Sequence, residues 1–92
     1  MAVAVLMNFP GGDNDAYDRV IQKMGLSDGT PPDGAHYHVA GEVDGGYRVV
    51  DVWESAERFQ QFAEEQIGPF SQEEGFPPPE VSIWEVHNTM SR

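Results

Sequence analysis

The sequence predicts a single α+β domain over residues 1–92, in which a four-stranded antiparallel sheet is covered on one face by two helices. Three observations predict this fold. The stretch HYHVAGEVDGGYRVVDVWE, residues 36–54, alternates apolar and polar residues on both sides of an Asp-Gly turn, as a β-hairpin does. A segment with the 3.6-residue spacing of an amphipathic helix precedes this hairpin and another follows it. A short apolar run lies near each end of the chain, so the order strand, helix, strand, strand, helix, strand is that of a ferredoxin-like domain.

The hairpin turns at Asp44-Gly45, and a turn of this type requires positive φ at both positions. Directly opposed residues share a face of the sheet. Counting outward from Val43 opposite Gly46 pairs Ala40 with Val49, His38 with Asp51, and His36 with Trp53. We expect the helices to cover the face that carries Tyr37, Val39, Val50 and Val52, and the same alternation places Arg48 there. The other face is a wall with titratable groups, formed by His36, His38, Ala40, Val49, Asp51 and Trp53.

Both predicted helices have recognisable start signals. Asp13 is placed to cap the first helix, which Gly25 ends, and Ser55 is placed to cap the second. Gly68-Pro69 is expected to break or kink the second helix, and residues 70–76 add a further turn before Gly75. The apolar stripes that we expect to be buried are Tyr17, Val20, Ile21 and Met24 in the first helix and Phe59, Phe62, Ala63 and Gln66 or Ile67 in the second. Residues 27–34, SDGTPPDG, form a loop.

The outer strands come from the two ends of the chain. Residues 2–9 form a valine-rich strand closed by Pro10-Gly11-Gly12, and residues 80–87 form the last strand, with Trp84 expected in the core. A sheet with both helices on one face leaves its other face open. We expect that open face to carry Val3, Val5, Val49 and Trp53 and to close against a second copy of the chain as a homodimer.

Composition narrows the possible partners. The chain has 16 acidic and 5 basic residues and a formal net charge of -11, which repels nucleic acid and anionic membranes. It has no cysteine for disulfide or thiolate chemistry. The start MAVAVLMNFPGG lacks the basic region of a signal peptide, and no apolar run approaches the length needed to cross a bilayer. A soluble cytoplasmic protein with a small-molecule ligand is therefore expected.

Residues 45–67, GGYRVVDVWESAERFQQFAEEQI, place a strand that ends in tryptophan directly before an amphipathic helix. With the element order, this phrase resembles the dimeric α/β-barrel superfamily, which includes antibiotic biosynthesis monooxygenases, stress-responsive barrel proteins and muconolactone isomerases. The resemblance covers nearly the full chain. It implies a dimer in which two sheets face each other and enclose a small-molecule cavity.

The haem-degrading branch of this superfamily uses an asparagine on the first strand, a tryptophan in the second helix and a histidine just after it. This sequence matches that pattern at Asn8 alone, because Phe59 and Phe62 stand in the helix and residues 64–76 contain no histidine. Haem is not expected, and no cofactor is predicted. The cofactor-free oxygenase branch has no obligatory motif to match, so that activity is implied by family likeness only.

His38 and Asp51 are the predicted catalytic residues. An aspartate opposite a histidine can hold one ring nitrogen, fix the tautomer and raise the basicity of the other nitrogen. Such a base could take a C–H or O–H proton from a phenol, an enol or a lactone, and the carbanion could isomerise, cyclise or react with dioxygen. The alternative is a cross-strand polar contact that serves folding only.

Other polar and aromatic residues are candidates for substrate binding. Asn8, Trp53, His36, Tyr47 and His87 form this set, although a solvated strand end is the favoured interpretation of His87 with Glu85, and residues such as Tyr47 and Trp53 more often pack at a dimer interface than bind a ligand. No metal is predicted. If one is bound, His36, His38 and Asp51 would be its ligands, because histidines two apart on a strand point the same way.

Three functions follow from these residues. The leading hypothesis is a cofactor-independent monooxygenase or isomerase of the barrel type acting on a small, aromatic or polyketide-like molecule. The second is a ligand-binding or stress-related barrel protein without chemistry, in which bulky apolar side chains would fill the pocket. The third is a histidine-based metal-binding barrel protein.

Overall fold

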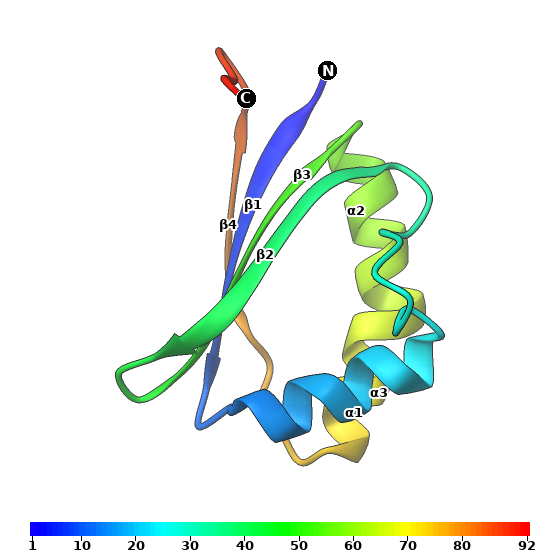
Figure 1. Ribbon diagram of the computed structural model, residues 1–92, viewed down its shortest axis with the longest axis vertical. Coiled ribbons are helices and arrows are strands. Elements are labelled where there is room, and N and C mark those ends of the chain that lie inside the picture. The colour runs from blue at the N-terminus through cyan, green and yellow to red at the C-terminus, as the bar shows by residue number, and fades with distance from the viewer.

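The computed structural model describes residues 1–92 and has the predicted element order. Four strands form one sheet in the order β2-β3-β1-β4, with antiparallel neighbours throughout, and the helices lie on one side of it (Figure 1). This is the predicted ferredoxin-like α+β fold. The strands are β1 (Val3–Pro10), β2 (Ala35–Val43), β3 (Gly46–Trp53) and β4 (Glu80–Glu85). The helices are α1 (Asn14–Met24), α2 (Ala56–Phe62), the π-helix η1 (Ala63–Ile67) and α3 (Gly68–Glu73).

The hairpin register is confirmed over most of its length. Val43 pairs with Gly46, Ala40 with Val49, and His38 with Asp51. The pairing predicted between His36 and Trp53 is wrong, because a bulge between residues 35 and 37 places Ala35 opposite Trp53. The turn also differs, since Gly45 has φ 80° while Asp44 keeps a negative φ. One positive φ suffices for this turn, and glycine provides it without strain.

The prediction of which face the helices cover is wrong, because they cover the opposite one. Apart from His36, which lies at the bulge, the residues predicted to share a face do share it, but the helices cover the side that carries His38, Ala40, Val49, Asp51 and Trp53. Tyr37, Val39 and Val50 lie on the uncovered side, with 58%, 59% and 38% of their surface exposed. Arg48 lies there too, where its Nε donates to Asn8 Oδ1 at 2.8 Å. The two sides of the sheet are named the covered face and the open face from here on.

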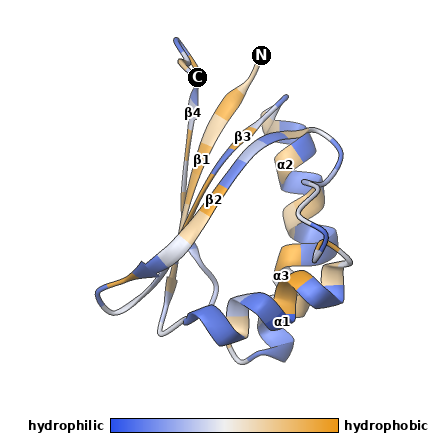
Figure 2. Ribbon diagram, viewed as in Figure 1, coloured by the Kyte–Doolittle hydropathy of each residue, from blue (hydrophilic) through white to orange (hydrophobic).

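The core lies between the covered face and the helices. On the sheet, the core residues are alternate residues of β1 and β3. Figure 2 shows hydrophobic residues along β1 in particular. The buried core residues are Val3, Val5, Met7 and Phe9 of β1, Tyr47, Val49 and Trp53 of β3, and Phe59 and Ile67 of the helices. The prediction that Trp84 is a core residue is wrong, because β4 is exposed along its whole length and Trp84 is 51% exposed.

Helix α1 begins and ends where the sequence predicts. Asp13 has an extended backbone and its side chain accepts from the backbone N–H of Ala16, which satisfies one of the free donors of the first turn. Gly25 ends the helix at φ 77°, a left-handed conformation that glycine adopts without a Cβ penalty. The helix therefore has a fixed position along the sheet.

The second helical segment kinks rather than stops at Gly68-Pro69. Ser55 caps α2 by accepting from Arg58 N–H, and the chain then passes through the π-helical residues of η1 into α3. Gly68 N–H bonds to the carbonyl of Ala63, five residues back. The wider π turn accommodates Pro69, which has no N–H to donate. None of the helices is long and apolar enough to span a membrane.

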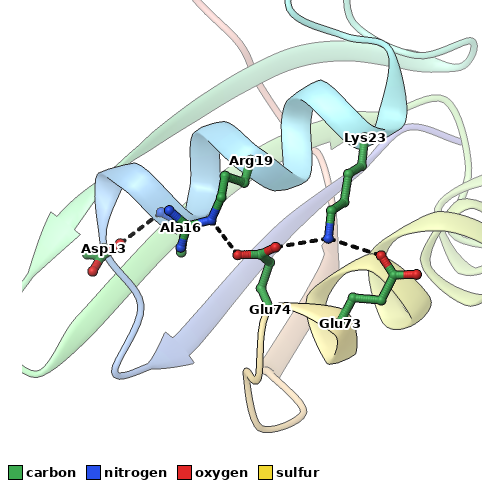
Figure 3. Close-up of polar contacts among 6 residues, drawn as sticks. All are labelled: Asp13, Ala16, Arg19, Lys23, Glu73 and Glu74. Carbon is green, nitrogen blue, oxygen red and sulfur yellow. Dashed lines mark hydrogen bonds and ion pairs between the residues drawn. The ribbon is translucent and has the colours of Figure 1, made fainter.

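Ion pairs join α1 to the end of α3. Arg19 Nε donates to Glu74 Oε1 at 2.6 Å, and Lys23 Nζ donates to Glu74 Oε2 at 2.9 Å and to Glu73 Oε2 at 3.0 Å (Figure 3). Hydrogen bonds from Arg19 and Lys23 hold the pKa of the Glu74 carboxyl below its usual value. Glu74 therefore bridges two cations that project from successive turns of α1.

Glu74→Gln is expected to lower the urea midpoint of unfolding at pH 7, with a difference from wild type that shrinks in acid. The folded-state pKa of Glu74 is lowered, so its stabilisation is fully present above the unfolded pKa and is lost as the pH falls through the folded value. Urea unfolding between pH 7 and pH 3 measures this. Glu64→Gln is the matched control, since Glu64 makes no ion pair, and an equal acid-side change in both variants would contradict the assignment.

Candidate active site

A cavity of about 470 Å³ lies between the covered face of the sheet and the helices of the same chain. Its size is in the range of small-molecule sites. Of its 24 lining residues 15 are hydrophobic, which favours an apolar or aromatic ligand over a strongly charged one. The cavity therefore differs from the predicted one, which was expected between two subunits.

The loop after α1 forms one rim of this cavity. Ser27, Thr30 and Pro31 line it, and the loop rejoins the sheet through Gly34, whose φ is 89°. A Cβ on Gly34 would stand 2.5 Å from Arg58 Cγ, so only glycine fits this close approach to α2. Glu54 N–H also donates to the carbonyl of Gly34 at 2.8 Å, which fixes the end of the loop near the start of α2 while its middle borders the cavity.

A row of four hydrogen-bonded side chains crosses the cavity wall. Trp53 Nε1 donates to Asp51 Oδ2 at 3.1 Å, and Asp51 Oδ1 lies 2.6 Å from His38 Nδ1. The other imidazole nitrogen of His38, Nε2, contacts the hydroxyl of Tyr17. Three of the four come from the hairpin strands, and Tyr17 reaches them from α1. The predicted cross-strand pair is therefore part of a larger network.

Burial in this row increases from His38 through Asp51 to Trp53. Trp53 is 1% exposed and Asp51 is 5% exposed, whereas the His38 side chain is 34% exposed. A buried carboxylate is stable only when its lone pairs are satisfied, and Asp51 accepts from both the indole and the imidazole. These two donors leave the carboxylate oriented and hold Nδ1–H of His38 toward it.

The proton positions follow from the donors available. The carboxylate of Asp51 accepts, so Nδ1 of a neutral His38 carries the hydrogen and Nε2 presents a lone pair. Burial raises the pKa of Tyr17 to about 12, and the charges of Tyr47 and Asp51 add to this effect. The Tyr17 phenol is accordingly protonated at neutral pH and donates to Nε2. In this arrangement His38 can act as a base through Nε2, and the Tyr17 hydroxyl occupies the lone pair of that nitrogen.

The structure brings five of the seven predicted site residues to the cavity. His38, Asp51, Trp53, Tyr47 and His36 all line it. The other two lie elsewhere. Asn8 lies on the open face beside Arg48, and His87 follows the end of β4, which stops at Glu85 rather than at the predicted residue 87.

The three candidate metal ligands do not form a metal site. No group of three or more His, Cys, Asp or Glu side chains in the structure is arranged to hold a metal ion. His36 is the unpaired residue at the bulge in β2, which disturbs the alternation that would have aligned it with His38, and both ring nitrogens of His38 already have partners.

Tyr17 is the site residue that the sequence did not predict. It occupies the first position of the α1 apolar stripe and was assigned to the core for that reason. Its ring does pack, with centroids 5.0 Å from the ring of Tyr47. The available signal was its hydroxyl, because a polar tip inside an apolar stripe needs a hydrogen-bond partner when buried.

Solved structures with the same fold include proteins from Streptomyces nogalater, Mycobacterium tuberculosis and Deinococcus radiodurans. SnoaB, a cofactor-independent oxygenase from Streptomyces nogalater, aligns with a TM-score of 0.65 and 18% identity over 99% of this chain and 98% of its own. Rv0793 from Mycobacterium tuberculosis aligns with a TM-score of 0.66 and 18% identity over 99% of this chain and 100% of its own. The Deinococcus radiodurans protein, provisionally described as an antibiotic biosynthesis monooxygenase, aligns with a TM-score of 0.62 and 8% identity over 100% and 98%.

These likenesses establish the class of fold. No protein-family model and no curated protein sequence matches the chain. The chain has a ferredoxin-like α+β fold, as predicted, and its structural neighbours include a cofactor-independent oxygenase and a protein provisionally described as an antibiotic biosynthesis monooxygenase. At identities of 8–18% the match concerns the fold and not the reaction.

Proposed function

We propose that the protein is a small-molecule enzyme that abstracts a proton from an organic substrate without a bound cofactor. His38 is the base, and Asp51 holds its tautomer and stabilises the imidazolium that forms. The observation that supports this most directly is the hydrogen-bonded row from Trp53 to Tyr17 on the wall of an apolar cavity. A His38–Asp51 pair that served folding alone would not need to line such a cavity.

The chemistry of the row suits acidic C–H and O–H groups. Loss of a proton from a phenol, an enol or a lactone gives a delocalised anion, which could isomerise, cyclise or react with dioxygen. SnoaB, which has this fold, is a cofactor-independent oxygenase, and oxygenation is the reaction that we propose first for this chain. The net charge of -11 disfavours anionic substrates, so we propose a neutral aromatic or polyketide-like molecule.

Exchange of solvent deuterium into 2-tetralone tests this function. This bicyclic ketone has acidic C–H groups, and NMR reports their exchange whatever reaction would follow. The wild-type protein is expected to accelerate exchange above the buffer rate, and His38→Gln is expected to slow it about 10²- to 10⁴-fold. Exchange at the buffer rate with the wild-type protein would contradict the proposal.

The alternative is a ligand-binding protein without chemistry. The cavity of about 470 Å³ supports a ligand site under either hypothesis, and it argues against a pocket filled by bulky side chains. Binding of 2-tetralone without faster exchange, and unaffected by His38→Gln, would favour this second function.

We also propose that two copies pair through their open faces. Large apolar side chains gather there, since Tyr37, Val39, Val50 and Trp84 are each between 38% and 59% exposed. A patch of this kind on a 92-residue domain favours burial against a partner of the same shape. Sedimentation velocity, which separates a single 10.2 kDa chain from a pair, tests the assignment.

A further inference from the structure

Tyr17 lies beside the candidate base on the wall of the cavity. It lines the cavity, and its hydroxyl contacts the one nitrogen of His38 that could accept a proton. The two rings are nearly parallel, at 11°, with centroids 5.9 Å apart. Because Nε2 faces this hydroxyl, a substrate proton would reach the nitrogen either through the phenol or after displacing it.

The ring of Tyr17 is held in place independently of that hydrogen bond. It packs on Tyr47 at a centroid distance of 5.0 Å and an interplanar angle of 26°, and Tyr47 is only 5% exposed. Helix α1 is in turn tied to α3 through Glu74. The hydroxyl is therefore positioned by the fold, as a group that acts on a substrate must be.

We propose that Tyr17 is a catalytic residue that relays the substrate proton to His38 and then donates a hydrogen bond to the anion. This inference rests on the proposed function and assigns the atom that touches the substrate. The alternative roles are a structural one, in which Tyr17 only orients His38, and an obstructing one, in which the substrate must displace it.

The relay balances in protons and charge. The substrate O–H or C–H bond breaks and its proton forms a new O–H bond on Tyr17, while the original Tyr17 hydrogen moves to Nε2 of His38. The products are a substrate anion, a neutral phenol and an imidazolium beside the Asp51 carboxylate. No electron is transferred, and no oxidant or other reactant is needed for this step.

Concerted transfer agrees with the environment of the phenol. Burial raises the pKa of Tyr17 to about 12, which disfavours a free tyrosinate. When the two protons move together, the phenol never carries a full negative charge. The neutral hydroxyl then faces the new anion, and a hydrogen bond to a charged group is stronger than one to a neutral group.

The test uses 4-nitrophenol as a probe, because its anion absorbs visible light and its neutral form does not. At a pH at which the free probe is mostly neutral, the wild-type protein is expected to ionise the bound probe. Tyr17→Phe keeps the ring and its packing on Tyr47, and it is expected to reduce the ratio of bound anion to bound neutral probe about ten- to a hundredfold. Ser82→Ala, which removes a hydroxyl from an exposed side chain of β4 that does not line the cavity, is the control and is expected to leave the ratio unchanged.

Each outcome separates the roles. An unchanged ratio in Tyr17→Phe would overturn the proposal, because the bound anion would then gain nothing from the Tyr17 hydroxyl, and an increased ratio would assign the obstructing role, because Nε2 would then be freed. A reduced ratio with a changed His38 tautomer, read from ¹⁵N NMR, would assign the structural role. A wild-type protein that leaves the probe neutral would contradict the proposed function as well, whereas ionisation that needs His38 but not Tyr17 would contradict the relay alone.

Discussion

Asp51→Asn is expected to slow deuterium exchange into 2-tetralone about 10²- to 10⁴-fold while the domain stays folded. The substitution keeps the volume of the side chain and removes its charge. Asp51 accepts two hydrogen bonds, from the indole of Trp53 and from the imidazole of His38, and an amide has only one oxygen to offer them. The expected loss in rate arises because two donors, the Trp53 indole and the His38 imidazole, compete for one amide oxygen.

Either orientation of the new amide is unfavourable. If its oxygen faces Trp53, its NH₂ group faces Nδ1, and His38 must change to the tautomer with its hydrogen on Nε2. That tautomer has no lone pair toward Tyr17 and cannot act as the base. If the oxygen faces His38 instead, two donors oppose each other at the buried indole, which costs about 1–3 kcal/mol of stability.

Non-additivity checks that the two residues act together. The double variant His38→Gln, Asp51→Asn is expected to be no slower than His38→Gln alone, because an orienting residue has no role once the base is removed. If the loss of exchange rate in the double variant equalled the product of the two single losses, Asp51 would act independently of His38. Full activity in Asp51→Asn would leave the pair as a cross-strand contact that serves folding only.

The sequence predicted the elements, the caps and most of the register because each depends on local chemistry. Asp13 and Ser55 accept from nearby backbone donors, and the Asp-Gly turn sets which residues oppose each other in the hairpin. The pairing of His38 with Asp51 follows from that count alone. These features need only the residues within a few positions of the turn or the helix end.

Which face the helices cover could not be read from the hairpin, because alternation groups residues by face but does not say which face is inside. Both faces of the hairpin carry apolar side chains. The choice depends on the sum over all strands, and Met7 and Phe9 of β1 with Tyr47 of β3 add to the side of His38. The same limit hid Tyr17, whose partner lies 21 residues further along the chain.

Trp53→Ala is expected to lower the free energy of unfolding by about 3–5 kcal/mol, a large share of the 5–15 kcal/mol typical of a folded domain. Trp53 is 1% exposed and its ring packs against Phe59 and Phe62 at centroid distances of 5.8 and 5.2 Å. Its removal leaves a cavity in the core and deprives the buried Asp51 carboxylate of a donor. Urea unfolding followed by circular dichroism measures the loss.

Trp84→Ala is the matched control, because the chain has only two tryptophans and the second lies on the open face at 51% exposure. Within one chain its removal exposes little new apolar surface, so the stability of the monomer should change far less than in Trp53→Ala. If two open faces pair, Trp84→Ala should instead weaken that pairing, and its effect should grow with protein concentration because folding and association are linked. Equal, concentration-independent losses in the two variants would contradict the assignment of the helices to the face that carries Trp53.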